Sequence, residues 1–190
     1  MHFALRLLVD ITLAVALLSA TMTASSADPR TPLPEHVGGW QQALFRLSIP
    51  VTRLTEGRMR HFTEHCTAVA VTPGPHSLFV SAWHCFEDYR STIMPILLVD
   101  HQTTTPVPMK LLATGGSMQE DWALLEPDSP LGIDTWIPIS TTPHHVGQPL
   151  IAAGFASKPD QSSDDTLKRY LVADIACSVI DASTHPPASD

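Results

Sequence analysis

Positive charge is scarce in this chain of 190 residues. It contains 11 Lys and Arg residues against 19 Asp and Glu residues, so its formal net charge is -8. The basic residues that are present form no dense cluster along the sequence. Because nucleic-acid-binding domains need a concentrated basic face, this composition argues against a nucleic-acid partner.

Long apolar runs are absent after residue 27, so we expect no membrane-spanning helix in the processed chain. Residues 1–27 are typical of an export signal, with Arg6 ahead of an apolar run at residues 11–20 and a Ser-Ser-Ala cleavage site at residues 25–27. The run is shorter than the about 20 residues that cross a bilayer comfortably, which disfavours an uncleaved anchor. The sequence therefore predicts a secreted or periplasmic protein, in a compartment where disulfides form.

Cysteine is rare, and metal-binding motifs are missing. Two of the three cysteines fit one disulfide and one is left over; they are Cys66, Cys85 and Cys177. The sequence has no His-Glu-x-x-His motif and no paired cysteines, and its closely spaced histidines are His61 with His65 and His144 with His145. Zinc needs three or four ligands in a fixed geometry, so we expect no metal site and no cofactor.

A helical hydrophobic period is absent beyond the export signal, and no internal repeat stands out. Short apolar or strand-like runs alternate instead with turn-forming segments, which predicts an all-β barrel or sandwich. The runs span residues 43–49, 66–71, 78–82, 92–99, 103–105, 107–112, 121–126, 136–139, 149–155 and 169–180. We also expect a loose leader at residues 28–39 and an exposed hairpin or loop at residues 52–65. A helical turn is expected at residues 86–89 and a linker at residues 127–135.

The strongest local pattern lies in residues 66–85. Residues 66–71 and 78–82 are strand-like, and the Thr-Pro-Gly-Pro-His-Ser segment between them is rich in turn formers. Two such runs around a Pro/Gly turn predict a β-hairpin. His84 and Cys85 follow the second run closely, so we expect the imidazole at the edge of a rigid sheet.

The Ser-Ala-Trp-His-Cys stretch at residues 81–85 resembles the Thr-Ala-Ala-His-Cys signature of the trypsin-like, chymotrypsin-fold serine proteases. The Cys-Thr pair at residues 66–67 resembles its upstream partner. The resemblance implies an all-β, chymotrypsin-like double β-barrel of the bacterial type. Its first barrel would occupy residues 40–126, and its second barrel would begin near residue 136 and be incomplete. It also implies a disulfide between Cys66 and Cys85, with Cys177 unpaired.

The same resemblance assigns two catalytic roles. In the family an imidazole takes the proton of a serine hydroxyl, and a buried carboxylate holds that imidazole in the right tautomer. His84 is the candidate base. Asp121 is the candidate orienting carboxylate, because the Asp-Trp-Ala-Leu-Leu stretch that it begins resembles the family's Asp-Ile-Ala-Leu-Leu. From the residues alone, a histidine that packs beside a disulfide and a polar residue that opens a strand stay open as alternatives.

Two substitutions depart from the family pattern near His84. Ala68 stands where the family usually has glycine, and Trp83 replaces a small residue next to the histidine. A bulky Trp83 must find room, so we expect packing or solvent access at His84 to differ from the family's.

The nucleophile of the family is missing. No Gly-Asp-Ser-Gly-Gly stretch occurs, and the family spacing puts it roughly 90 residues after the aspartate, at about position 211. The available hydroxyls lack the glycines that would let backbone N–H groups face an oxyanion, so we interpret them as surface or strand serines; they are Ser157, Ser162, Ser163 and Ser178. The resemblance also places the partner of Cys177 beyond residue 190.

The sequence therefore predicts a secreted trypsin-like endopeptidase by family, with a polypeptide as substrate, that is inactive as this chain. Two alternatives stay open. One is a non-catalytic binding module on the same fold, and the other is an unrelated exported β-rich protein.

Overall fold

The computed structural model describes residues 30–33, 39–90, 94–99, 105–156 and 170–180, and the descriptions below refer to these. The proposed export signal at residues 1–27 lies outside them. The described elements are strands and two short 3-10 helices, η1 (Gly39–Ala43) and η2 (Trp83–Cys85). In this part of the chain, no helix has the length and apolar character needed to cross a bilayer. The prediction of an all-β protein is confirmed.

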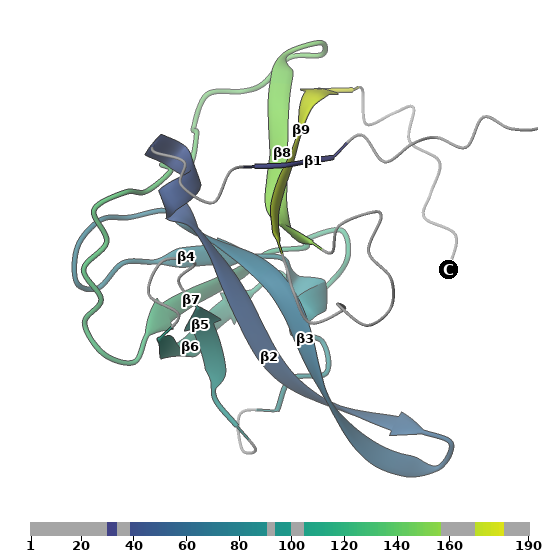
Figure 1. Cartoon of the computed structure of the whole chain (residues 1–190). Helices are drawn as coiled ribbons and strands as arrows, with labels where there is room; N and C mark the ends of the chain where they lie inside the picture. Colours follow the sequence, from purple (N-terminus) through teal and green to yellow (C-terminus); the bar gives the residue numbers. More distant parts are fainter. Residues whose placement is uncertain (1–29, 34–38, 91–93, 100–104, 157–169, 181–190) are drawn as a thin grey trace, which may run out of the picture.

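Six strands form a closed barrel in the order β2-β3-β4-β7-β6-β5 (Figure 1). They are β2 (Leu44–Thr55), β3 (Arg58–Ala70), β4 (Phe79–Ser81), β5 (Ile96–Val99), β6 (Pro106–Thr114) and β7 (Ala123–Pro127). Every neighbouring pair is antiparallel. The hairpin predicted around residues 72–77 is present, because Val69 pairs with Val80 and Ala70 with Phe79.

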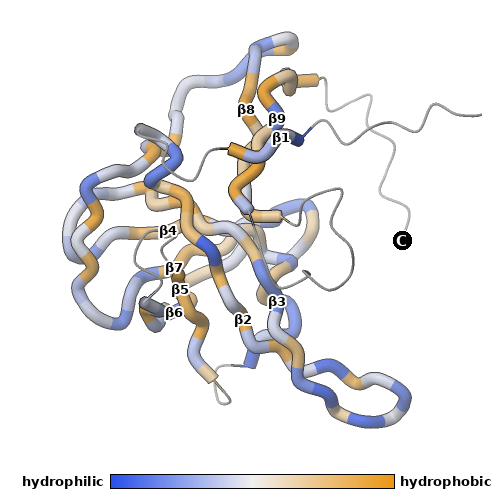
Figure 2. Tube along the Cα trace, in the orientation of Figure 1, coloured by the Kyte–Doolittle hydropathy of each residue, from blue (hydrophilic) through white to orange (hydrophobic). Residues whose placement is uncertain are grey.

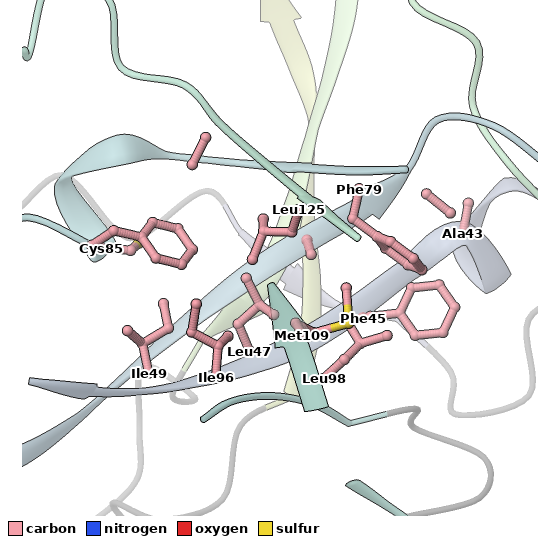
Figure 3. Close-up of a cluster of buried hydrophobic side chains, with 14 of the residues drawn as sticks. Ala43, Phe45, Leu47, Ile49, Phe79, Cys85, Ile96, Leu98, Met109 and Leu125 are labelled. Carbon is pink, nitrogen blue, oxygen red and sulfur yellow. The ribbon is translucent and has the colours of Figure 1, made fainter. Parts of the chain in front are cut away.

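The barrel core follows from the alternation of its strands. In β2 the side chains of Leu47, Ile49 and Val51 are buried, while those between them are partly exposed. Figure 3 shows the buried side chains converging from several strands. Phe45 and Phe79 meet edge to face, with ring centroids 5.4 Å apart and planes at 82°. Each fully buried Leu, Ile or Phe contributes about 1.5–3 kcal/mol relative to an exposed side chain.

The polar segment at residues 52–65 is a hairpin, formed by the extended ends of β2 and β3 (Figure 1). Thr55 pairs with Arg58, which leaves Glu56 and Gly57 as a two-residue turn with φ values of 54° and 73°. Positive φ at both positions is the signature of the type I′ turn, whose twist matches the flanking strands. Figure 2 shows that the tip is largely hydrophilic, as the composition of this segment predicts.

A second, open sheet lies beside the barrel in the order β1-β9-β8 (Figure 1). Its strands are β1 (Thr31–Pro32), β8 (Pro149–Ala156) and β9 (Tyr170–Ser178). The runs predicted at residues 149–155 and 169–180 therefore pair with each other in this second sheet, as the antiparallel strands β8 and β9.

Several local expectations need correction. Thr31 and Pro32 pair with β9, so part of the expected loose leader belongs to the second sheet. The expected helical turn at residues 86–89 is a single hydrogen-bonded turn, in which the Tyr89 N–H donates to the Phe86 carbonyl at 2.9 Å, and the 3-10 helix η2 lies just before it. The apolar run at residues 136–139 forms no strand.

Two further strand bounds differ from the predicted ones. The run predicted at residues 107–112 lies within the longer strand β6. Of the run predicted at residues 103–105, residues 103–104 fall outside the described residues. Pro127, expected to open the linker, is the last residue of β7.

Candidate functional site

A disulfide anchors the segment that carries His84. Cys66 in β3 is bonded to Cys85 at the end of η2, with the two Cα atoms 6.5 Å apart, as the resemblance implied. Cys85 is buried, while His84 beside it is exposed. The disulfide and the burial of Cys85 in the core therefore fix the position of the backbone at His84.

Strand order brings Asp121 to the same place. β4 pairs with β7, and Ser81 at the end of β4 faces Ala123 at the start of β7. His84 follows Ser81 closely and Asp121 closely precedes Ala123. Because neighbouring antiparallel strands end and begin at the same rim of a barrel, these two residues meet there.

Both carboxylate oxygens of Asp121 interact with His84. Oδ2 lies 2.9 Å from the ring atom Nδ1, and Oδ1 accepts the backbone N–H of His84 at 2.9 Å. The backbone N–H of Trp83 also bonds to this carboxylate. Ala82, at the N-cap position of η2, provides no side-chain cap. Asp121, in the loop before β7, supplies instead the acceptor that an N-cap side chain usually gives.

The charge state of the pair follows from these bonds. Partial burial acts most strongly and raises the pKa of Asp121. The hydrogen bonds from His84 and Trp83 and the charge interaction with His84 together outweigh it and leave that pKa below its ordinary value of 3.8. The carboxylate is therefore ionised at neutral pH and can only accept hydrogen bonds. The proton of a neutral His84 ring then resides on Nδ1, which leaves Nε2 free to accept another proton.

The outer side of the imidazole is open. The His84 side chain is 51% exposed, whereas that of Asp121 is 27% exposed. Trp83, the bulky substitution noted above, is partly exposed and does not bury His84. Ala68, the other departure, is fully buried in the barrel core. The arrangement can thus take a proton at Nε2 from a group that approaches the exposed side of the ring.

Thr67 joins this region to the second sheet. Its carbonyl accepts the Ser81 hydroxyl at 2.7 Å, and its Oγ1 accepts the Phe155 N–H at 2.8 Å. A Cβ on Gly154 would lie 2.9 Å from Thr67 Oγ1, so that glycine permits the close approach of β8 to β3. In the sequence Thr67 stands out only as part of the Cys-Thr pair, and no local signal points to a partner in β8.

No hydroxyl in the described residues completes a triad. His84 has no hydrogen bond to a serine in this part of the chain, and Ser178 is an exposed residue at the end of β9. The other three candidate hydroxyls fall at residues 157–163, outside the described residues. The described residues therefore bring His84 and Asp121 together without a serine hydroxyl bonded to the ring.

His61, His65 and Cys177 have local partners. His61 Nδ1 lies 3.1 Å from Thr52 Oγ1, and His65 Nδ1 lies 3.5 Å from Ser48 Oγ, in both cases between paired residues of β2 and β3. The described residues contain no group of three or more His, Cys, Asp or Glu side chains placed to hold a metal ion. Cys177 forms no disulfide, and a hydrogen bond with Asp174 raises the pKa of its thiol.

An apolar pocket of about 370 Å³ lies elsewhere on the barrel. Residues of the β2–β3 hairpin and of the chain entering β5 line it, among them Thr52, Phe62 and Met94. His84 and Asp121 do not line it, so it is separate from the candidate site.

Comparison with known proteins adds no assignment. No family model matches the chain, and no curated protein matches it significantly.

Proposed function

We propose that this protein is a trypsin-like serine endopeptidase by descent, exported through residues 1–27, whose chain retains the base and orienting carboxylate of the Ser-His-Asp triad without the nucleophile. In this proposal the closed barrel is the first barrel of a chymotrypsin-like fold, and the second sheet is part of the second barrel. The observation that carries the proposal is the bond between His84 Nδ1 and Asp121 Oδ2, beside the Cys66–Cys85 disulfide.

The proposed chemistry assigns one role to each member of the pair. Asp121 holds the Nδ1–H tautomer of His84 and would stabilise the imidazolium that forms when Nε2 takes a proton. That proton would come from a serine hydroxyl attacking the peptide carbonyl, and the imidazolium would return it to the leaving amine. The 190 residues contain no Gly-Asp-Ser-Gly-Gly stretch to supply this serine, so the isolated chain is expected to be inactive.

Peptidase assays of the pure chain test the proposal directly. We expect no hydrolysis above background with peptide or casein substrates, and no labelling by a fluorophosphonate probe for activated serines. His84→Ala and Asp121→Asn serve as matched controls and should give the same baseline. Robust hydrolysis that disappears in His84→Ala would show that a nucleophile is present and would overturn the inactive assignment.

A non-catalytic binding module on the same barrel is the second candidate. The exposed imidazole with no hydroxyl partner in the described residues, together with the second role of Asp121 as a backbone cap, is compatible with a site kept for structural reasons. The genomic sequence after codon 190 discriminates the two. A Gly-Asp-Ser-Gly sequence in any reading frame favours the protease, and a stop followed by unrelated sequence favours the binding module.

A further inference from the structure

The loop that carries Asp121 is compact and internally bonded. It connects β6 to β7 through residues 115–122, and the Gly115 N–H closes it by donating to the Trp122 carbonyl at 2.9 Å. Inside it, the Glu120 N–H lies 3.2 Å from both the carbonyl and the hydroxyl oxygen of Ser117. These bonds give the loop one defined path rather than several.

Asp121 lies at the centre of a three-residue turn within this loop. The Trp122 N–H donates to the Glu120 carbonyl at 2.8 Å, which is the bond that defines a γ-turn. Asp121 has no positive φ, so the turn is the inverse form that is common next to strands. The direction in which the Asp121 carboxylate leaves the backbone therefore depends on where the Glu120 carbonyl sits.

Gly115 leaves the space for that carbonyl. A Cβ built on Gly115 would overlap the Glu120 carbonyl oxygen, and it would lie 2.6 Å from Glu120 Cβ and 2.8 Å from Glu120 C. Three atoms this close cannot be relieved by turning a flexible side chain, because two of them are backbone. Gly115 has no positive φ, so the requirement is for space and not for an unusual backbone conformation.

We propose that Gly115 is a positioning residue for the Asp121–His84 pair. Its missing side chain admits the Glu120 carbonyl, which closes the turn that directs the Asp121 carboxylate onto His84 Nδ1. The catalytic meaning of this role rests on the proposed function. The geometric role concerns only the tautomer and orientation of His84.

The test compares Gly115→Ala with Gly132→Ala by ¹⁵N NMR of the histidine rings. Gly132 is the matched control, because a Cβ there meets nothing within 4 Å and its φ is not positive. Spectra are recorded near pH 8.5, well above the ordinary histidine pKa of about 6.5, so that the rings are neutral. We expect the Nδ1–H signature of His84 in the wild type and in Gly132→Ala, and its loss in Gly115→Ala, while amide signals of the barrel strands persist.

A folded Gly115→Ala protein that keeps the wild-type His84 signature would overturn the inference. If Gly115→Ala does not fold, Ser117→Ala is measured instead, because it removes the side-chain acceptor of the Glu120 N–H without adding bulk. It should shift His84 partly toward the Nε2–H tautomer, and an unchanged tautomer would count against the inference. Because no proteolysis is measured, failure of the peptidase proposal would leave these spectra unaffected.

Discussion

The closed barrel and the open second sheet both contain apolar strands, but they bury the side chains of those strands to different extents. Each barrel strand has two neighbours, and the inward residues of β2 are almost fully buried. In the second sheet β8 pairs only with β9 among the described residues, and its first four residues are all exposed. Figure 2 shows hydrophobic residues along β8 and β9 despite this exposure.

The difference shows that closure, more than strand composition, decides burial here. Ile49 in β2 is fully buried, whereas Ile151 in β8 is 55% exposed and Ile175 in β9 is 72% exposed. β8 also lacks charged residues, which natural proteins use to protect exposed strand edges. The stability of the molecule should therefore reside in the barrel, and its tendency to associate should reside in the second sheet.

Matched isoleucine truncations should separate the two regions most strongly. Ile49→Ala should lower the free energy of unfolding by about 2–5 kcal/mol, since it leaves a cavity in the barrel core. Ile151→Ala should change it by less than about 0.5 kcal/mol, because that side chain is largely in water already. Urea unfolding followed by circular dichroism measures the free energy of unfolding of both variants. Equal losses in the two variants would refute the inference that stability resides in the barrel.

Removing the disulfide should have the next largest effect. Replacing Cys66 and Cys85 together with serine should cost about 3 kcal/mol, because the bond limits the unfolded chain across a short loop. Cys177→Ser in the second sheet is the control and should leave the unfolding midpoint nearly unchanged, since this cysteine forms no disulfide. A comparable loss from Cys177→Ser would place more stability in the second sheet than we infer.

Asp121 should contribute a smaller, pH-dependent amount to the barrel. Asp121→Ala should cost about 1 kcal/mol at neutral pH, because η2 loses its capping acceptor. The folded-state pKa lies below 3.8, so this contribution is complete above that value and is lost as the pH falls through the folded-state pKa. The difference between the wild type and the variant should shrink accordingly in unfolding curves from pH 7 to about pH 2. A difference that stays constant would contradict the assigned ionisation.

A charge on β8 should have the smallest effect on stability and a visible effect on association. Ile151→Lys places a lysine on the unprotected strand, which should reduce self-association in light scattering at high protein concentration. Met118→Lys adds the same charge to an exposed position in the β6–β7 loop and should have little effect. If both variants reduce association equally, net charge and not the strand edge is responsible.

Much of the barrel was predictable from local patterns. The turn formers between two strand-like runs predicted the β3–β4 hairpin. The polar composition of residues 52–65 predicted an exposed hairpin or loop, which is the β2–β3 hairpin in the structure. These features depend on residues close in sequence, whose side-chain period and turn preferences act locally. The resemblance at residues 81–85 and 66–67 added the Cys66–Cys85 disulfide, which the structure confirms. The resemblance at residues 121–125 added Asp121 as the partner of His84, and the structure has Asp121 Oδ2 2.9 Å from His84 Nδ1.

Other features depend on residues that are distant in sequence. Thr31 reaches across to Ala173 in the second sheet, and Thr67 accepts the Phe155 N–H. Neither partner carries a local signal, because a backbone hydrogen bond can form with almost any residue. The role of Gly115 was also hidden, since the carbonyl that occupies its side-chain space belongs to Glu120 and is visible only in the folded loop.

Sequence pattern was thus sufficient for the all-β class, the central hairpin and the residue types at the site. The tertiary structure decided which strands close into a barrel, which apolar faces stay in water, and how the carboxylate of Asp121 meets the ring of His84. The reason is physical: period and turn preference are encoded residue by residue. Closure, edge exposure and an ångström-scale fit arise only when distant segments compete for the same space.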